Sequence, residues 1–169
     1  MKGTRILVSS PTRGVYEDIH VVGTPKPGTL MEIEPTTAPI GGRFSYAAYG
    51  TTTYDNGDFV ENDGDRKVIA VLLEKDQEGD TYDDAYADDD LGRIYFPAPG
   101  EQLNMRVENQ GGTGDSFAIG DELMADNGTG KLLACDTDAE AHPFTVLEVV
   151  AALTADACVW CRFNSAGGA

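Results

Sequence analysis

Short apolar or alternating runs, separated by turn residues, recur along most of the chain. Val68–Leu73 is a continuous apolar run of strand length that is rich in β-branched residues. Gln102–Glu108 alternates polar and apolar residues, which is typical of a strand with one buried face. Turn residues interrupt such runs roughly every 8–15 residues, and no helical periodicity extends over ten residues. The pattern predicts an all-β protein, either a β-sandwich or a β-barrel.

The last third of the chain has the clearest strand pattern. Glu122–Ala125 and Lys131–Ala134 flank the turn Asp126–Gly130, whose Asn-Gly pair supplies the positive φ angles of a tight hairpin. Phe144–Val150 and Cys158–Phe163 follow as two further apolar runs. We therefore expect a hairpin and two closing strands here.

The proline-rich stretch Thr24–Gly28 divides the chain into an arm and a body. Each proline fixes its own φ and favours an extended residue before it, so this stretch is a stiff elbow. Residues 1–24 contain two short apolar runs without a compact pattern, and we predict an extended N-terminal arm. Residues 25–164 are the predicted body, within which 35–67 is a long polar segment that we interpret as a possible insertion. Residues 165–169 form a small-residue tail, predicted to be flexible.

The charge of the protein is strongly negative but unevenly distributed. The formal net charge is −17, which argues against nucleic acid as a partner, because phosphate binding needs clustered Lys and Arg. The predicted arm and elbow are locally basic. In the arm, Tyr16 is followed by two acidic residues, Glu17 and Asp18. Acidic side chains dominate the rest, and we interpret the run Asp83–Asp90 as a solvated loop rather than a cation site. The candidate contact residues of the basic segment are Lys2, Arg5, Arg13, Tyr16 and Lys26.

No apolar run is long enough for a membrane helix, and the first ten residues lack the pattern of a secretory signal. We therefore expect synthesis in a cytoplasm and no membrane partner. The odd number of cysteines, three, favours reduced thiols over a disulfide framework.

The cysteines suggest one metal-site alternative. Cys158 and Cys161 form a Cys-x-x-Cys motif, and Cys135 and His142 would complete four zinc ligands. However, residues three apart on a strand point to opposite faces, so the two thiols would diverge. We therefore interpret them as buried structural cysteines and expect neither a metal nor another cofactor.

The sequence offers little for catalysis. It has only two histidines, and it lacks a nucleophile elbow, a phosphate-binding loop and a His-Glu-x-x-His motif. We therefore predict that the protein is not an enzyme and acts by binding another protein. An alternative is a carbohydrate- or receptor-binding β-sandwich on a virion surface, in which exposed aromatic rings stack on the ligand. The candidate rings are Tyr46, Tyr49, Tyr54 and Trp160, each of which could instead belong to the core.

One ordered series of features, over about residues 25–163, resembles the head decoration (cement) proteins of tailed bacteriophages. Lys26–Ile33 contains a Pro-Gly-Thr entry into the body, and the apolar strand Val68–Leu73 leads to an acidic loop. Pro99–Asn104 and the hairpin Gly120–Leu132 then follow in the same order and precede the closing strands. The resemblance is one of order and spacing, and residues 35–67 do not align with it.

This resemblance implies a structural role on a virion. Such proteins bind the outer surface of the expanded head, commonly as homotrimers, and cement neighbouring major capsid protein subunits. The resemblance also implies a jelly-roll-like or tulip-like body, no cofactor, and a terminal arm that reaches across the shell. A basic arm on an acidic body would be steered toward an acidic capsid surface, which is an independent physical reason for the same role.

Overall fold

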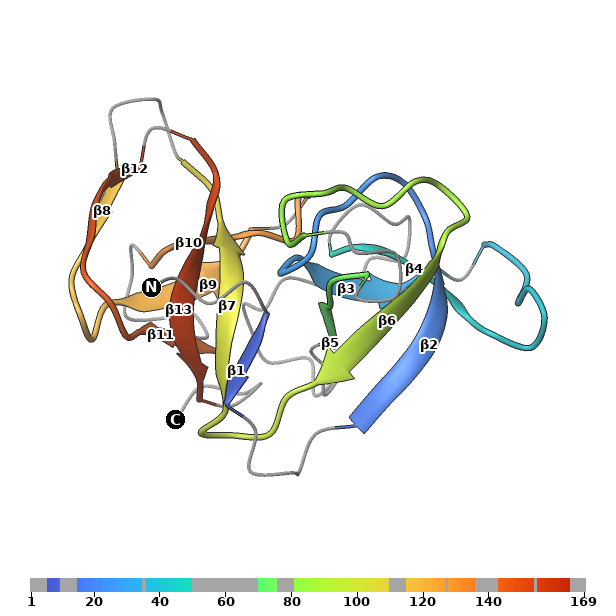
Figure 1. Cartoon of the computed structure of the whole chain (residues 1–169), viewed down its shortest axis with the longest axis horizontal. Coiled ribbons are helices and arrows are strands. Elements are labelled where there is room, and N and C mark those ends of the chain that lie inside the picture. Colours follow the sequence, from blue (N-terminus) through green and yellow to red (C-terminus); the bar gives the residue numbers. More distant parts are fainter. Residues whose placement is uncertain are drawn as a thin grey trace.

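The described residues of the structure, a computed structural model, form strands and turns, which confirms the predicted all-β class. The elements gather into two lobes that lie side by side (Figure 1). The structure describes residues 6–9, 15–34, 36–49, 70–75, 81–109, 115–126, 128–135, 143–153 and 155–164.

Thirteen strands are present in these residues, and most coincide with the apolar or alternating runs of the sequence. The strands are β1 (Leu7–Ser9), β2 (Val15–Val21), β3 (Leu30–Ile33), β4 (Ser45–Ala48), β5 (Ala70–Leu72), β6 (Leu91–Phe96), β7 (Gln102–Val107), β8 (Asp115–Phe117), β9 (Glu122–Ala125), β10 (Leu132–Ala134), β11 (Phe144–Val146), β12 (Val150–Leu153) and β13 (Ala157–Phe163).

One lobe, which we call the barrel lobe, is a closed barrel of five strands in the order β2-β4-β3-β5-β6. β2 pairs antiparallel with β6 along its length, from Val15 opposite Phe96 to His20 opposite Leu91. On its other side β2 pairs with the parallel strand β4 only near its end. Alternate residues of the strands point inward and, with Tyr86 from the loop before β6, make a small apolar core: Ile19, Val21, Met31, Tyr46, Ala70, Leu72, Tyr86 and Ile94.

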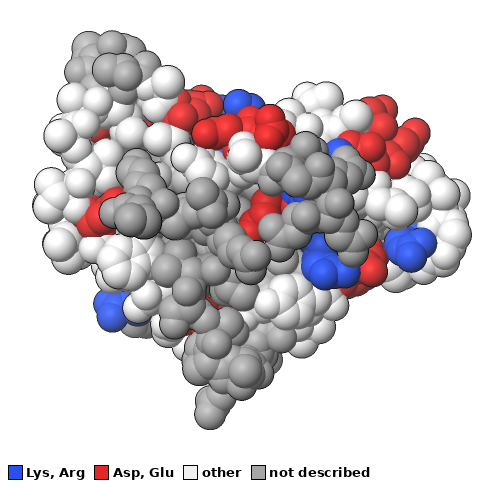
Figure 2. All heavy atoms as spheres, viewed as in Figure 1, with Lys and Arg blue, Asp and Glu red and all other residues white. Residues whose placement is uncertain are grey.

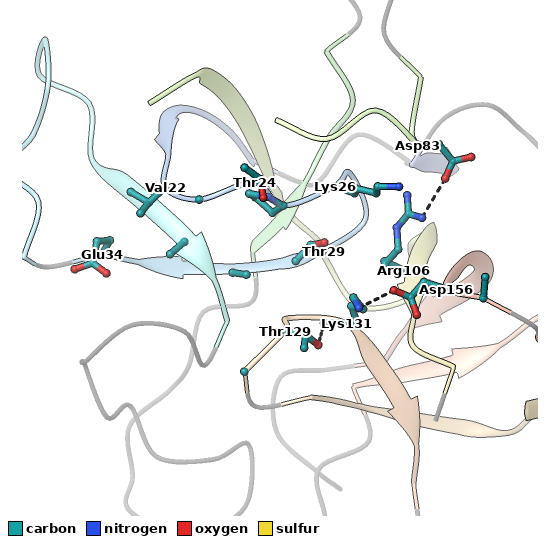
Figure 3. A pocket seen from close by; sticks show the side chains of 16 residues that line it. Val22, Thr24, Lys26, Thr29, Glu34, Asp83, Arg106, Thr129, Lys131 and Asp156 are labelled. Carbon is teal, nitrogen blue, oxygen red and sulfur yellow. Dashed lines mark hydrogen bonds and ion pairs between the residues drawn. The ribbon is translucent and has the colours of Figure 1, made fainter. Parts of the chain in front are cut away.

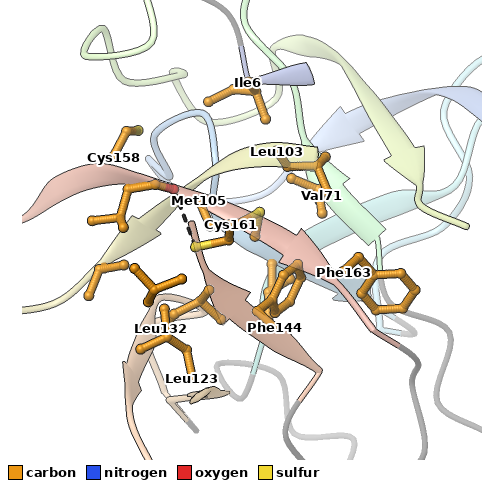
Figure 4. Close-up of a cluster of buried hydrophobic side chains, with 14 of the residues drawn as sticks. Ile6, Val71, Leu103, Met105, Leu123, Leu132, Phe144, Cys158, Cys161 and Phe163 are labelled. Atoms are coloured by element: carbon orange, nitrogen blue, oxygen red, sulfur yellow. Dashed lines mark hydrogen bonds between the residues drawn. The ribbon is translucent and has the colours of Figure 1, made fainter. Parts of the chain in front are cut away.

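The other strands form the second lobe. Its main sheet has the order β1-β7-β10-β9-β11-β13. Because β13 also pairs with β7, the five strands from β7 to β13 in this order form a closed ring. β8 and β12 form a separate two-stranded ribbon. The core of this lobe is larger and includes Leu103, Met105, Phe144 and Phe163, with the two aromatic rings 5.4 Å apart (Figure 4).

The two lobes are joined by direct backbone contacts. Leu30 N donates to Gly130 O at 2.7 Å, and Arg106 N donates to Gly28 O at 2.9 Å. Val71 and Tyr95 belong to barrel strands, yet both side chains pack in the core of the second lobe. The lobes therefore share a buried junction.

The predicted arm and insertion differ from the observed arrangement. β2, which lies within the predicted arm 1–24, is a strand of the barrel, and Ile6 is completely buried in the core of the second lobe. The described part of the arm is thus integrated into the fold, because its apolar residues find partners far away in the sequence. Within the segment 35–67, β4 is also a barrel strand. Residues 50–67 of that segment and the predicted tail 165–169 lie outside the described residues.

Candidate functional site

The predicted contact residues do not come together at one place. Lys2, Arg5 and Arg13 lie outside the described residues. Tyr16 is 51 % exposed near the start of β2, where its ring lies 4.9 Å from the ring of Tyr95. Lys26 is exposed in the connection that follows the other end of β2. The surface around Tyr16 and the groove beside Lys26 are therefore two separate candidate sites.

The groove has a volume of about 690 Å³ and is lined by residues of both lobes (Figure 3). Lys26 and Thr29 come from the connection between β2 and β3. Arg106 comes from β7, and Lys131 and Asp156 come from the connections before β10 and β13. Its position places it over the junction of the lobes.

The charged groups of the groove are largely neutralised by one another. Arg106 is 2 % exposed and donates from Nη1 to Asp83 at 3.1 Å, while Lys131 Nζ lies 2.6 Å from Asp156. Burial alone would raise the pKa of Asp156, but hydrogen bonds from Lys131 and from the Asn109 amide lower it. These pairs hold the acidic loop and two connections against the sheet, so the groove is better explained by structure than by ligand binding.

Most exposed large apolar side chains of the described residues lie on the barrel lobe; the others, Ile119 and Val149, lie in the second lobe. Those of the barrel lobe belong to β2, to the end of β3, to the segment between β3 and β4, and to the start of β6. The apolar pattern of the sequence does not predict this surface, because exposure depends on which side chains the barrel leaves uncovered. The one sequence feature that indicates it is the adjacency of two apolar residues at the start of β2. The side chains of the barrel lobe are Val15, Tyr16, Ile33, Ile40, Phe44 and Leu91.

The acidic loop before β6 is exposed and internally hydrogen-bonded. Figure 2 shows acidic side chains along the upper edge of the molecule, over the region of this loop. Asp90 accepts a hydrogen bond from Lys75, the main reason that its pKa is lowered, and another from the Ala87 amide. The side chain of Asp84 accepts bonds from the amide and hydroxyl of Thr81, which lower its pKa. Turns, not a helix, order this loop.

The cysteines do not assemble a metal site within the described residues. Cys158 and Cys161 lie on opposite sides of β13, as the strand geometry predicts (Figure 4). Cys161 is completely buried, which raises the pKa of its thiol, and its Sγ donates to Val159 O. Cys135 is partly buried after β10, and His142 lies outside the described residues. No group of three or more potential ligands occurs in the part of the chain that the structure describes.

Two of the four aromatic residues of the carbohydrate-binding alternative are buried. Tyr46 and Tyr49 are 5 % and 6 % exposed and belong to the two cores, the other role that the sequence left open for them, so they do not offer stacking surfaces. Burial, with a contribution from Glu17, raises the pKa of Tyr46 to about 12. Trp160 is partly buried on β13, and Tyr54 lies outside the described residues. The described residues also include no helix that is long and apolar enough to cross a membrane.

The sequence matches no protein-family model and no curated protein. The structure, in contrast, is similar to a solved one, the N base of head fiber gp8.5 in bacteriophage phi29, with a TM-score of 0.50. The match covers 93 % of this chain and 98 % of that chain, and 9 % of the matched residues are identical. At this identity the similarity is one of fold, and it extends over both lobes.

Proposed function

We propose that this chain is a structural protein of a bacteriophage virion that binds the outer surface of the capsid and cements neighbouring major capsid protein subunits. The observation that carries the proposal is the fold similarity to the base of a phage head fiber, which extends over nearly the whole of both chains. The order of strands and turns in the sequence supports the same class of protein independently. We further propose that the chain acts as a homotrimer.

The surface properties are consistent with this role. Carboxylates dominate the exposed loop before β6, whereas six large apolar side chains are exposed on the barrel lobe. Several exposed large apolar side chains on one lobe are typical of a protein-binding surface. The barrel lobe is therefore the part that we expect to face the capsid, with the acidic loop directed toward solvent.

The test compares phage heads with and without the chain. Heads assembled without it are mixed with the purified protein, pelleted, and heated alongside untreated heads. We expect saturable binding to heads and a higher temperature of head disruption, because each copy would link neighbouring subunits. Binding without any gain in heat resistance would exclude cementing but keep a head-bound role, and no binding would reject the proposal. Sedimentation velocity of the purified chain tests the trimer.

A further inference from the structure

The first half of β2 is a sheet edge in the described structure. Residues Val15–Asp18 pair with β6 on one side. On the other side, β4 begins opposite His20, and only His20 and Val21 have partners there. No described strand lies beside Val15–Asp18 on this edge, and Figure 1 shows this part of β2 extending below β4.

The backbone of this edge is oriented for hydrogen bonding. His20 N donates to Phe44 O at 3.1 Å and Val22 N donates to Tyr46 O at 2.8 Å, so even-numbered residues here direct their amides toward the β4 side. Because residues two apart in a strand point the same way, the amides and carbonyls of Tyr16 and Asp18 face that side as well. They continue the line that β4 occupies farther along.

The side chains beside the edge are exposed and apolar or acidic. Val15 is 62 % exposed, Tyr16 is 51 % exposed, and Phe44, at the point where β4 begins, is 52 % exposed. Glu17 lies on the face of β2 that carries the buried Ile19 and Val21, and is therefore directed toward the barrel opening. Asp18 is exposed on the outer face, where it pairs with Arg93 at 2.9 Å. An exposed edge flanked by apolar groups is a template for strand addition.

We propose that Val15–Asp18 of β2 accepts an extended strand of a capsid protein, in which two apolar residues are followed by two Lys or Arg residues. This inference rests on the proposed function, because the strand would come from the shell to which the chain binds. Main-chain bonds to Tyr16 and Asp18 would provide affinity. Val15 and Glu17 lie on one face of β2 and Tyr16 and Asp18 on the other, so an apolar pair beside Val15 and Tyr16 and a basic pair beside Glu17 and Asp18 would match both faces.

Charge favours such a partner over a second copy of this chain. Antiparallel pairing of two β2 edges would bring Glu17 and Asp18 close to the same residues of the other copy, and like charges across a strand pair are destabilising. The net charge of −17 adds to that repulsion. The Lys or Arg residues of a basic strand would instead be attracted to Glu17 and Asp18.

The experiment uses the whole protein and a synthetic lysine–valine peptide of about eight residues, in which two valines alternate with two lysines. Binding is measured by calorimetry, with a glutamate–valine peptide of equal length as the control. The matched variants are Asp18→Pro, which removes the edge amide and the carboxylate, and Asp18→Ala, which removes only the carboxylate. Proline is tolerated at an unpaired edge, so the β2–β6 ladder should persist.

We expect the lysine–valine peptide to bind, and Asp18→Pro to weaken it at least about tenfold more than Asp18→Ala does. Equal binding by the two variants, or equal binding of the two peptides, would overturn the proposal. If Asp18→Pro does not fold, amide hydrogen exchange of the unchanged protein provides the test. The peptide should slow exchange of the Tyr16 and Asp18 amides, and unchanged exchange rates there would reject the proposal. Peptide binding without head binding would reject only the proposed function, and head binding without peptide binding would reject only this inference.

Discussion

Gly130 is the residue that allows the two lobes to approach one another. A Cβ atom at this position would lie 2.4 Å from Leu30 O and 2.9 Å from Tyr49 N, both backbone atoms that cannot rotate away. Its φ of +66° also lies in the left-handed region that favours glycine. Gly23 has a φ of +80° but no atom near its virtual Cβ.

This difference makes Gly130→Ala and Gly23→Ala a matched pair. We expect Gly23→Ala to lower the free energy of unfolding by about 1 kcal/mol through backbone strain. Gly130→Ala should lower it by about 2 kcal/mol more, because the lobes must also separate locally. Urea unfolding of both variants measures the difference, and equal losses would mean that the junction is not tightly packed.

Tyr46 is one residue whose ionisation should affect stability at alkaline pH. Its pKa of about 12 in the folded protein lies above the ordinary value of 10.0. Below pH 10 the phenol is neutral in both the folded and the unfolded chain, so its ionisation does not change the free energy of unfolding. As the pH rises from 10 toward 12, only the unfolded chain ionises at this position, so the folded state loses stability.

We therefore expect Tyr46→Phe to resist alkali better than the unchanged protein. Between about pH 9 and pH 11.5, the variant should lose about 2 kcal/mol less unfolding free energy. Urea unfolding at the two pH values gives both losses, and comparison within each protein cancels the packing effect of the missing hydroxyl. Parallel losses in the two proteins would show that Tyr46 ionises as easily folded as unfolded.

At the scale of elements, the region Phe144–Val150 is divided into β11 and the start of β12, although its apolar pattern predicts one strand. Glu148 causes the interruption: its carboxylate accepts a hydrogen bond from Trp160 N at 2.9 Å, in place of a backbone carbonyl. The last backbone bond of this ladder runs from Leu147 N to Trp160 O at 2.8 Å, and β12 then pairs with β8 instead of β13. A side chain thus caps the ladder where the chain changes its partner strand, which no apolar pattern indicates.

Glu148→Ala should therefore destabilise the protein. The Trp160 amide would lose its acceptor in a partly buried position, and we expect the free energy of unfolding to fall by about 1 to 1.5 kcal/mol. Glu148→Gln keeps an acceptor oxygen and should lose less than half of that. The midpoints of urea unfolding measure both changes, and a glutamine variant as unstable as the alanine variant would contradict this role of the carboxylate.

At the scale of the whole molecule, the two lobes have separate cores but a shared junction. Three residues of barrel strands direct their side chains into the core of the second lobe: Leu30, Val71 and Tyr95. Tyr95 also donates from its hydroxyl to the buried Glu101 at 2.6 Å, across the turn that connects β6 with β7. The core of the second lobe is therefore not complete without the barrel strands.

The chain should consequently unfold in one cooperative transition. Far-ultraviolet circular dichroism follows the strands of both lobes, whereas fluorescence follows Trp160, the single tryptophan, which lies in the second lobe. We expect both melting curves to coincide, and the calorimetric and van't Hoff enthalpies to agree within about 10 %. Two separated transitions would mean that the lobes fold independently.

The sequence by itself determined the all-β class, most of the strands and the acidic surface. Val68–Leu73 and Gln102–Glu108 are strands or contain strands because a period of two, or an apolar β-branched run, specifies local conformation and the buried face. The same rule predicted that Cys158 and Cys161 would diverge, as they do on β13. These features depend on neighbours within a few residues.

Only the tertiary structure decided which strands pair and what remains uncovered. Val15–Val21 has the pattern of a strand, but its place in the barrel depends on β6, which lies more than 70 residues away in the sequence. Backbone hydrogen bonds carry no sequence information, so local pattern could not distinguish an arm from a barrel strand. The same non-local pairing leaves Tyr16 and Asp18 without a neighbouring strand among the described residues on the β4 side, and it buries Arg106 beneath the acidic loop.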